Sequence, residues 1–284
     1  MVDQEQLRIE IRRNVAAALA EDVGTGDLTA RLIAAGQTTR GKVVSREDAV
    51  LCGTAWFDCC FQTLDANAAV AWHARDGERV RAGQTLCEVE AQTRALLTAE
   101  RQALNFLQLL SGTATTTRRY VDAVAGTGAH IVDTRKTLPG LRLAQKYAVR
   151  TGGGTNHRTG LYDGILIKEN HILAAGGLRQ ALEAARELAP SNVFIQIEVE
   201  TLEQLGEALA AGALMILLDN MSLEQMREAA HVTAGRASLE ASGGVGLEHV
   251  RAIAETGVDR ISIGALTKDV RAVDLSLRHV EKQR

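Results

Sequence analysis

The chain has 284 residues, of which 46% are hydrophobic, so it can bury a sizeable core as one large domain or two modest ones. Its formal net charge is −3, which argues against a nucleic-acid-binding protein or a protein attracted to anionic membranes. The charged N-terminus lacks the apolar region of a signal peptide and no segment reaches the length of a membrane span, so we expect a cytoplasmic protein.

The first part of the chain predicts a leading helix followed by short strands. Residues 1–22 are charged and amphipathic, as expected of a surface helix. Residues 41–53, 68–80 and 82–91 are short apolar runs with Gly and Asp at their ends, which is typical of strands joined by turns.

All four cysteines lie in the first third of the chain. None forms a Cys-x-x-Cys pair and two are adjacent, which suits neither a metal site nor a disulfide framework. We therefore expect small apolar side chains in a reducing compartment. The cysteines are Cys52, Cys59, Cys60 and Cys87.

A long helix is predicted over residues 93–124. Its leucines are spaced for packing on more than one side, and the charged pair Glu100 and Arg101 lies between apolar turns.

We place the end of an N-terminal α/β domain at residue 107, with a C-terminal helix over 269–284 joining it, and a second domain over 108–268.

The second domain alternates apolar runs with amphipathic helical segments, which predicts a parallel sheet with helices outside. About six strands are clear, so a short or incomplete α/β barrel is favoured over a complete eight-stranded one. The predicted strands are 130–134, 164–170, 193–200, 214–220, 237–244 and 260–266; the helices are 178–189, 202–212, 222–230 and 247–257.

Polar residues follow the apolar part of every predicted strand in this domain. In a parallel α/β barrel the C-terminal strand ends open onto one face, where substrates bind. The residues at these ends are Asp133, Arg135, Lys136, Lys168, Asn170, His171, Glu198, Glu200, Asp219, Asn220, Ser242, Gly243, Gly244 and Gly264.

Basic residues gather in one short part of this mildly acidic chain. Gathering like charges costs roughly 4 kcal/mol per close pair at an effective dielectric near 20. Such a group is expected where an anion offsets it, since arginine grips carboxylates or phosphates and lysine acts as a point charge. The residues are Arg135, Lys136, His157, Arg158 and Lys168.

Two acids and two glycine-containing turns complete the predicted face. Glu198 and Asp219 could hold sugar hydroxyls, bind Mg²⁺ or stabilise a cationic transition state. The turns at 242–244 and 264–266 are similar to late barrel loops that bind phosphate through backbone N–H groups. The glycines at 152–154 do not form a P-loop, because no Gly-Lys-Ser/Thr follows.

Eight motifs along the chain match one known family in order and length. They are GDLT at 26–29, ERQALNFLQLLSG at 100–112, DTRKTLPGLR at 133–142, KYAVRTGGGTNHRTGLYDGILIKENH at 146–171, EVE at 198–200, LLDNM at 217–221, EASGG at 240–244 and GVDRISIGALTK at 257–268. On these motifs the chain resembles the quinolinate phosphoribosyltransferases, also called nicotinate-nucleotide pyrophosphorylases (carboxylating).

The resemblance implies the type II phosphoribosyltransferase architecture, an N-terminal α/β sandwich followed by an open α/β barrel, assembled at least as a homodimer. It implies that the ring nitrogen of quinolinate displaces pyrophosphate from 5-phosphoribosyl-1-pyrophosphate with Mg²⁺. Loss of the 2-carboxylate as CO2 then gives nicotinate mononucleotide for NAD synthesis. The resemblance implies neither an organic cofactor nor a covalent nucleophile.

The resemblance also assigns site residues. Lys136, Lys168, Glu198 and Asp219 would be catalytic, and Glu198 and Asp219 would hold the ribose hydroxyls and Mg²⁺. Arg101 would arrive from the neighbouring subunit. The quinolinate pocket would be lined by Arg135, His157, Arg158 and Lys168, with Lys136 at its junction with the pyrophosphate. Further substrate contacts, several of them to the 5-phosphate, would come from Thr134, Ser242, Gly243, Gly244, Ile263, Gly264, Ala265 and Lys268, the last standing where many relatives carry His.

Three alternatives stay open at this point. A related phosphoribosyltransferase could act on nicotinate or another ring acid, although one carboxylate would leave the cations in excess. A Schiff-base aldolase could use Lys168. A non-catalytic dicarboxylate sensor would explain the cations but not Glu198, Asp219 or the phosphate-type loops.

Overall fold

The computed structural model describes residues 4–280, and the chain divides into two compact units. The first unit takes in the residues up to Arg118, Leu138–Gly153 and the residues from Asp269 on. The second consists of Arg119–Thr137 and Gly154–Lys268. The predicted boundary at residue 107 falls inside one helix, Thr93–Ala123.

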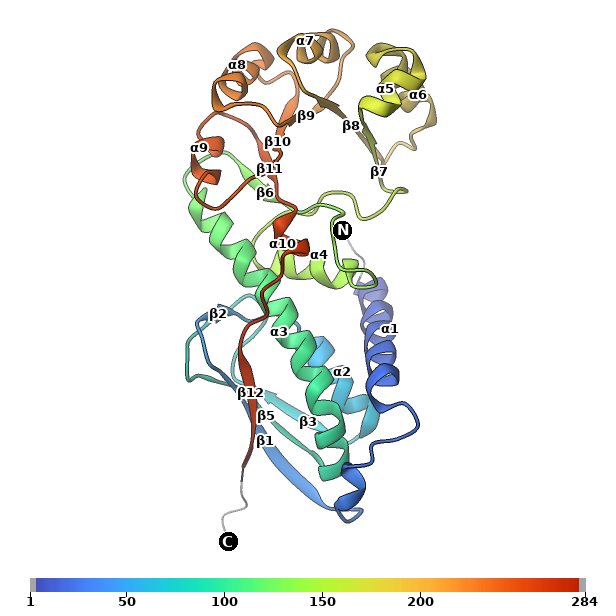
Figure 1. Ribbon diagram of the computed structural model, residues 1–284, viewed down its shortest axis with the longest axis vertical. Helices are drawn as coiled ribbons and strands as arrows, with labels where there is room; N and C mark the ends of the chain where they lie inside the picture. Colours follow the sequence, from blue (N-terminus) through green and yellow to red (C-terminus); the bar gives the residue numbers. More distant parts are fainter. Residues whose placement is uncertain (1–3, 281–284) are drawn as a thin grey trace. The chain divides into compact units, whose positions relative to one another are not determined.

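The first unit contains an antiparallel sheet of four strands in the order β12-β1-β5-β3, accompanied by helices (Figure 1). A two-stranded pair, β2 and β4, completes its strands in the described residues. The elements are α1 (Gln4–Val23), η1 (Ala30–Leu32), β1 (Thr38–Ser45), β2 (Ala49–Val50), α2 (Thr54–Leu64), β3 (Ala69–Trp72), β4 (Arg79–Val80), β5 (Thr85–Gln92), α3 (Thr93–Ala123), α4 (Arg142–Thr151) and β12 (Leu275–Val280).

The core of the first unit is built from side chains of α1, α2, α3 and the four-stranded sheet. Phe57 packs against Phe61 and Trp72, with ring centroids 5.0 and 5.3 Å apart. The cysteines are free thiols, and burial raises the pKa of Cys60 to about 12, so the predicted role of a small buried side chain is confirmed for it.

Helix α2 is absent from the sequence prediction, which placed only strands between the leading helix and residue 93. The residue before the helix, Gly53, has no side chain to cap it. Asp76 supplies the cap instead, because its carboxylate accepts hydrogen bonds from the amides of Gly53 (3.1 Å) and Thr54 (3.2 Å). The helix start is thus stabilised by a residue far away in sequence.

The predicted C-terminal helix over 269–284 is wrong, because Leu275–Val280 forms strand β12. β12 runs antiparallel to β1 and adds a fourth strand to the sheet of the first unit. The alternation of Leu275 and Leu277 with polar residues has the period of a strand, and Gly41 of β1 leaves room for Leu277. Residues 281–284 lie outside the described part of the chain.

The second unit contains six parallel strands in the order β6-β11-β10-β9-β8-β7, and β6 and β7 are its two edges. The predicted open α/β barrel is therefore confirmed, as are its six strands. The elements are β6 (His130–Val132), β7 (Gly164–Ile167), α5 (Glu169–Ala175), α6 (Leu178–Leu188), β8 (Phe194–Val199), α7 (Leu202–Ala210), β9 (Met215–Asp219), α8 (Leu223–Thr233), β10 (Ser238–Ser242), α9 (Val250–Ala254), β11 (Arg260–Ser262) and α10 (Ala265–Lys268).

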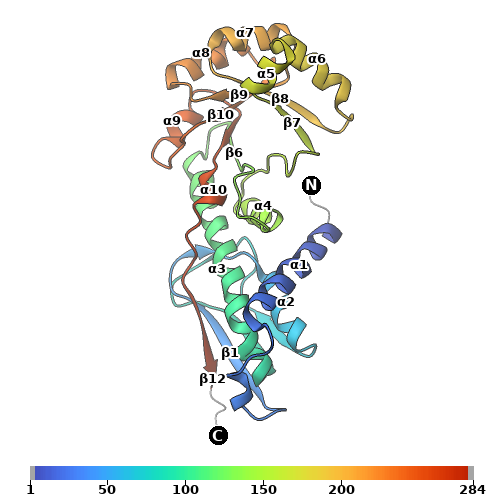
Figure 2. The ribbon, with the colours of Figure 1, turned by 45° about the vertical axis from the view of Figure 1, so that its right-hand side comes forward.

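Helices α6, α7 and α9 contact the strands from one face of this sheet, as Figure 2 shows. Successive side chains of a strand point to opposite faces. On β8 the residues Ile197 and Val199 belong to one face, and Gln196 and Glu198 to the other. The helices cover the apolar face, which leaves the polar face available for a site. Within residues 4–280, no helix is both long and apolar enough to cross a membrane.

Candidate active site

The strand register of the second unit brings the predicted polar residues to one rim of the sheet. Asp219 of β9 pairs with Ser242 of β10, and Ile167 pairs with Ile197, so the residues that follow these two, Lys168 and Glu198, are neighbours. On the other side, Val132 of β6 pairs with Ser262 of β11. The predicted convergence of the strand ends is therefore present in the structure.

Lys168 and Glu198 form an ion pair at this rim. Lys168 Nζ donates to Glu198 Oε2 at 2.7 Å, with side chains 50% and 13% exposed. The backbone N–H of Lys168 donates to His171 Nδ1 at 3.0 Å, which fixes the start of α5. Since one partner is half exposed, the pair contributes little to stability, about 0–1 kcal/mol.

Arg158 lies in the loop 154–163, and a backbone carbonyl holds its guanidinium. Its Nη1 donates to the carbonyl of Gly164 at 2.9 Å. Burial lowers the pKa of the Arg158 guanidinium and the charge of Arg135 lowers it further, while Asp163 opposes both. The two arginines are thus close enough to repel each other.

The loop that carries Arg158 is fastened by two carboxylates. The buried Asp133 accepts from Asn156 Nδ2 at 2.6 Å and from the amide of His157 at 2.8 Å. Asp163 accepts from the amides of Thr159 (2.7 Å) and Gly160 (2.8 Å). Burial opposes the charge on Asp163, but these amide hydrogen bonds outweigh it and lower the pKa of the carboxyl. The loop is held in shape by its own hydrogen bonds.

His157 differs from the other predicted basic residues. The His157 side chain is 7% exposed, and its Nδ1 accepts a hydrogen bond from the backbone N–H of Arg158 at 2.7 Å. A nitrogen that accepts from an N–H must present a lone pair to it. The sequence prediction had grouped His157 with the cations by residue type.

The turn after β6 lies against the loop after β11. Thr134 Oγ1 accepts from the amide of Lys136 at 3.1 Å, and Thr267 Oγ1 donates to the carbonyl of Lys136 at 2.7 Å. A Cβ placed on Gly264 would lie 3.0 Å from Lys136 Cδ, so the glycine leaves room for the Lys136 side chain. Lys136 is exposed and adjoins the predicted phosphate loop.

The other predicted contact residues after β11 differ in their exposure to solvent. Ile263 is 2% exposed and its amide donates to Val132 O at 2.9 Å, so its side chain is part of the core. A substrate contact at Ile263 would have to use its backbone. Ala265 begins the short helix α10 and the exposed Lys268 ends it.

The acids and the Ser-Gly-Gly turn are connected through Asn220. Asn220 has a left-handed backbone (φ 54°), and its side-chain amide donates to Asp219 Oδ2 at 2.8 Å. Its backbone N–H donates to Ser242 O at 3.0 Å. Gly243 (φ 106°) and Gly244 (φ 55°) follow with positive φ, which only glycine adopts readily. The turn therefore presents exposed backbone beside Asp219.

Glu198 and Asp219 supply as many carboxylates as a Mg²⁺ site usually takes from the protein. Within the described residues no group of three or more His, Cys, Asp or Glu side chains could hold a metal ion. Mg²⁺ does not need such a group, because it is usually bound by one or two carboxylates together with waters and substrate phosphates. Glu198 and Asp219 supply two carboxylates from neighbouring strands.

Arg101 belongs to the first unit, on α3. Its side chain is exposed and makes no hydrogen bond or ion pair within residues 4–280. A cavity of about 360 Å³ lies in the same unit among α1, α3 and residues 139–141, and none of the predicted site residues lines it. The candidate site is therefore the rim of the second unit rather than this cavity.

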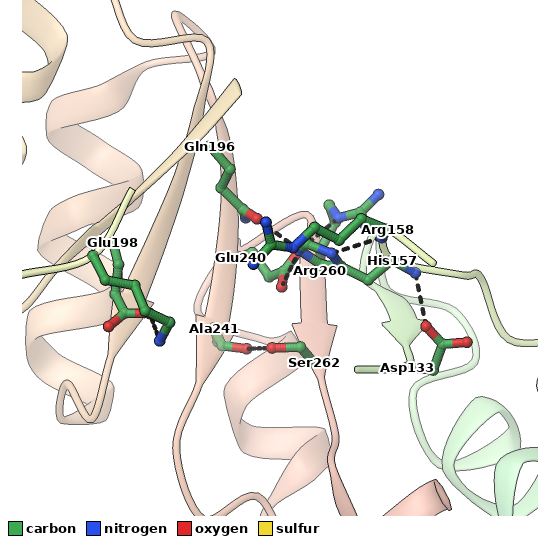
Figure 3. A network of polar contacts seen from close by, with 10 residues as sticks. Asp133, His157, Arg158, Gln196, Glu198, Glu240, Ala241, Arg260 and Ser262 are labelled. Carbon is green, nitrogen blue, oxygen red and sulfur yellow. Dashed lines mark hydrogen bonds and ion pairs between the residues drawn. The ribbon is translucent and has the colours of Figure 1, made fainter. Parts of the chain in front are cut away.

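The sequence prediction missed the buried residues that support the rim. Gln196 accepts from His157 Nε2 at 2.7 Å, and Glu240 accepts from Arg260 Nε at 2.8 Å (Figure 3). Gln196 and Glu240 are the polar residues that interrupt two otherwise apolar strands. That interruption is a signal which could have found them, since a buried polar side chain needs a partner.

The chain matches both domains of one family. Residues 27–111 match "Quinolinate phosphoribosyl transferase, N-terminal domain" and residues 113–278 match "Quinolinate phosphoribosyl transferase, C-terminal domain". The chain is 43% identical over 269 residues to the "Probable nicotinate-nucleotide pyrophosphorylase (carboxylating)" of Bacillus subtilis, covering 95% of this chain and 93% of that protein. It is 45% identical over 276 residues to the "Nicotinate-nucleotide pyrophosphorylase (carboxylating)" of Mycobacterium leprae, covering 94% and 96%. The solved nicotinate-nucleotide pyrophosphorylase of Francisella tularensis has a TM-score of 0.93 at 44% identity, covering 96% of this chain and 97% of that one.

Proposed function

Because this chain belongs to the quinolinate phosphoribosyltransferase family, we infer that it transfers the phosphoribosyl group of 5-phosphoribosyl-1-pyrophosphate to the ring nitrogen of quinolinate. Decarboxylation follows, and the products are nicotinate mononucleotide, pyrophosphate and CO2. The enzyme is a decarboxylating pentosyltransferase of NAD biosynthesis.

The observation that best supports this function is that basic and acidic side chains lie at the same rim of the sheet. Arg158 and Arg135 repel each other there, while Lys168 already contacts Glu198. A dicarboxylate would neutralise the cations, and a sugar with an attached pyrophosphate would bring hydroxyls to the acids.

We assign quinolinate binding to Arg135, Arg158 and Lys168. Arginine holds a carboxylate through two parallel hydrogen bonds, so the arginines fix the ring plane and with it the direction of the ring nitrogen. Holding nitrogen and C1 of the ribose in line converts an encounter of two molecules into a step within one complex. The contribution of His157 is that of a neutral group.

The phosphoribosyl donor would lie between the acids and the glycine turns. Glu198 and Asp219 would hold ribose hydroxyls, and their negative charge would stabilise the ribose as the C1–O bond lengthens. The backbone of Ser242–Gly244 and Gly264, with Lys268, would hold the 5-phosphate. Lys136 would hold the departing pyrophosphate.

Mg²⁺ would be bound by Glu198 and Asp219 together with the substrate's own oxygens. It would neutralise negative charge on the pyrophosphate and so make it a better leaving group. The protein side chains would keep the donor oriented.

Decarboxylation needs no dedicated organic cofactor in this proposal. The ring nitrogen becomes positively charged once it is bonded to C1, so the ring can accept the electrons left at C2 as CO2 departs. No side chain forms a covalent bond to substrate. The Schiff-base alternative would need a free amine at Lys168, whereas its ammonium donates to Glu198 at 2.7 Å.

The test is turnover of quinolinate with phosphoribosyl pyrophosphate and Mg²⁺, measured as nicotinate mononucleotide and CO2. Nicotinate in place of quinolinate is the control, since it lacks the second carboxylate. We expect product only with quinolinate. Equal or greater turnover of nicotinate would contradict the proposal, and a stable borohydride adduct at Lys168 would favour the aldolase.

We also propose a homodimer with shared sites, which the exposure of Arg101 permits. Arg101→Ala and Lys168→Ala should each be nearly inactive as pure proteins. After subunit exchange the mixture should recover part of the activity, because one site in the hybrid would keep both residues. Absence of recovery when exchange is demonstrated by mass spectrometry would exclude the shared site.

A cytoplasmic location remains a prediction. Fractionation of cells that express the tagged chain would test it, with product formation followed in each fraction.

A further inference from the structure

A buried polar cluster lies beneath the rim, formed by four side chains of the second unit. His157 comes from the loop 154–163, Gln196 from β8, and Glu240 and Arg260 from β10 and β11; Figure 3 shows them pointing toward one another. Gln196 is 0% and Glu240 1% exposed. Polar groups buried this deeply are costly unless they are hydrogen-bonded in a defined way.

The hydrogen bonds determine which nitrogen of His157 carries the proton. The backbone N–H of Arg158 can only donate, so His157 Nδ1 is the acceptor at 2.7 Å. The proton of the neutral ring is then on Nε2, which donates to Gln196 Oε1 at 2.7 Å. The same reasoning fixes the orientation of the Gln196 amide, because its NH2 group could not accept from Nε2–H.

The charges around His157 would otherwise favour a cation. Glu240 Oε1 is 3.7 Å from Nε2, and Asp133 accepts the amide of His157. Arg260 offsets Glu240 by donating at 2.8 Å, and Arg158 itself disfavours a second positive charge. Phe194 covers the ring by an edge contact with centroids 5.4 Å apart. Protonation of Nδ1 would also break its hydrogen bond with Arg158.

We propose that Gln196 is a positioning residue that holds His157 as the neutral Nε2–H tautomer and thereby fixes Arg158 for substrate binding. The chain of contacts is short: Gln196 orients the ring, the ring holds the amide of Arg158, and Gly164 holds its guanidinium. The contribution to quinolinate binding rests on the proposed function, whereas the tautomer does not.

One substitution at this position and one control separate the roles. Gln196→Met has nearly the same shape but lacks the acceptor, so the Nε2–H is left buried without a partner. Thr233→Val is a matched control, since Thr233 is 2% exposed in the same unit and its hydroxyl has no hydrogen-bond partner within the described residues.

The first measurement is the ¹⁵N NMR spectrum of the protein with labelled histidine, in which His157 is assigned by comparison with His157→Gln. We expect the wild-type ring to carry its proton at Nε2 and none at Nδ1 at neutral pH. Gln196→Met should lose this pattern. A proton at Nδ1 in the wild type would overturn the proposal.

The second measurement is steady-state kinetics with both substrates. Gln196→Met should raise the KM for quinolinate about 10- to 100-fold, the loss expected when a buried hydrogen bond is broken. The KM for phosphoribosyl pyrophosphate should change less than about twofold. Equal changes in both KM values, or the same losses in Thr233→Val, would indicate a general structural effect and overturn the positioning role.

The two measurements distinguish this inference from the proposed function. A wild-type chain that shows the Nε2–H tautomer but does not turn over quinolinate would overturn the proposed function alone. A chain that turns over quinolinate with unchanged KM in Gln196→Met would overturn the positioning role alone.

Discussion

Gly243 is the position where a single added carbon should damage the site most clearly. It follows β10 in the Ser-Gly-Gly turn with φ 106°, a backbone conformation that residues with a side chain rarely adopt. A Cβ at Gly243 would overlap Asn220 Oδ1 and would lie 2.8 Å from Asn220 Cγ and 3.1 Å from its backbone N. Asn220 could move away only by breaking its hydrogen bond to Asp219.

Two effects add up in Gly243→Ala. The positive φ costs about 1–2 kcal/mol for a residue with a Cβ. Overpacking against Asn220 costs about 1–3 kcal/mol more. The free energy of unfolding should therefore fall by about 2–5 kcal/mol, which lowers Tm by about 4–20 °C for a domain of this size. Activity should fall as well, because the displaced Asn220 releases Asp219.

The assay is a thermal melt and a turnover measurement on four variants: Gly243→Ala, Gly235→Ala, Asn220→Gly, and Asn220→Gly combined with Gly243→Ala. Gly235→Ala is the matched control, since Gly235 has φ 75° with open space within 4 Å of its Cβ position, so only backbone strain should appear. Asn220→Gly combined with Gly243→Ala should recover at least 1 kcal/mol relative to the sum of the single changes. If Gly243→Ala matches Gly235→Ala in Tm and activity, or if the double variant is additive, the overlap with Asn220 does not govern this turn.

Three further predictions concern charge. Burial raises the pKa of the Asp58 carboxyl to about 6, so its protonated form stabilises the fold below about pH 4 and that contribution is lost as the pH rises through about 6. Asp58→Asn should therefore raise the free energy of unfolding by roughly 1–2 kcal/mol at pH 8, because solvent screens this partly exposed group, and leave it unchanged at pH 4. The exposed Asp22→Asn should show no such difference, and melts across this pH range decide. Lys136→Ala should lower kcat by at least about 100-fold with a Tm change under about 2 °C, because Lys136 is exposed and its proposed contact is with the leaving group. A large fall in Tm would indicate a structural role for Lys136 instead. Lys168→Met and Glu198→Gln should each change Tm by no more than about 3 °C and abolish most turnover, since an exposed ion pair contributes about 0–1 kcal/mol; a large loss of stability with activity retained would contradict the site assignment.

The six strands of the second unit are predictable from sequence because each is a short apolar run that must be buried on a parallel sheet. Their C-terminal ends meet for a topological reason, so Lys168, Glu198 and Asp219 could be placed on one rim without a structure. Helix α2 could not be predicted in this way, because the residue that caps it, Asp76, is recognisable only once the chain has folded.

The loop 154–163 marks the limit of prediction within the site. Sequence reasoning selected His157 and Arg158 by residue type and treated both as cations. The protonation of His157 depends on hydrogen bonds with the neighbouring amide and with Gln196 of a strand 39 positions away. Spacing does not contain that information, because the donor and acceptor at each nitrogen follow from the folded geometry.

On the polar face of the second unit's sheet, a layer of buried polar residues lies beneath a layer of more exposed charged residues at the rim. Gln196 and Glu198 are two residues apart on β8 and point to the same face, as do Glu240 and Ser242 on β10. In the deep layer, charge is compensated within the protein: Arg260 holds Glu240. At the rim, Lys168 is half exposed, and burial together with the charge of Arg135 lowers the pKa of Arg158. A new charge should consequently cost more at Gln196 than at the rim, since desolvation penalises a buried ion far more than an exposed one.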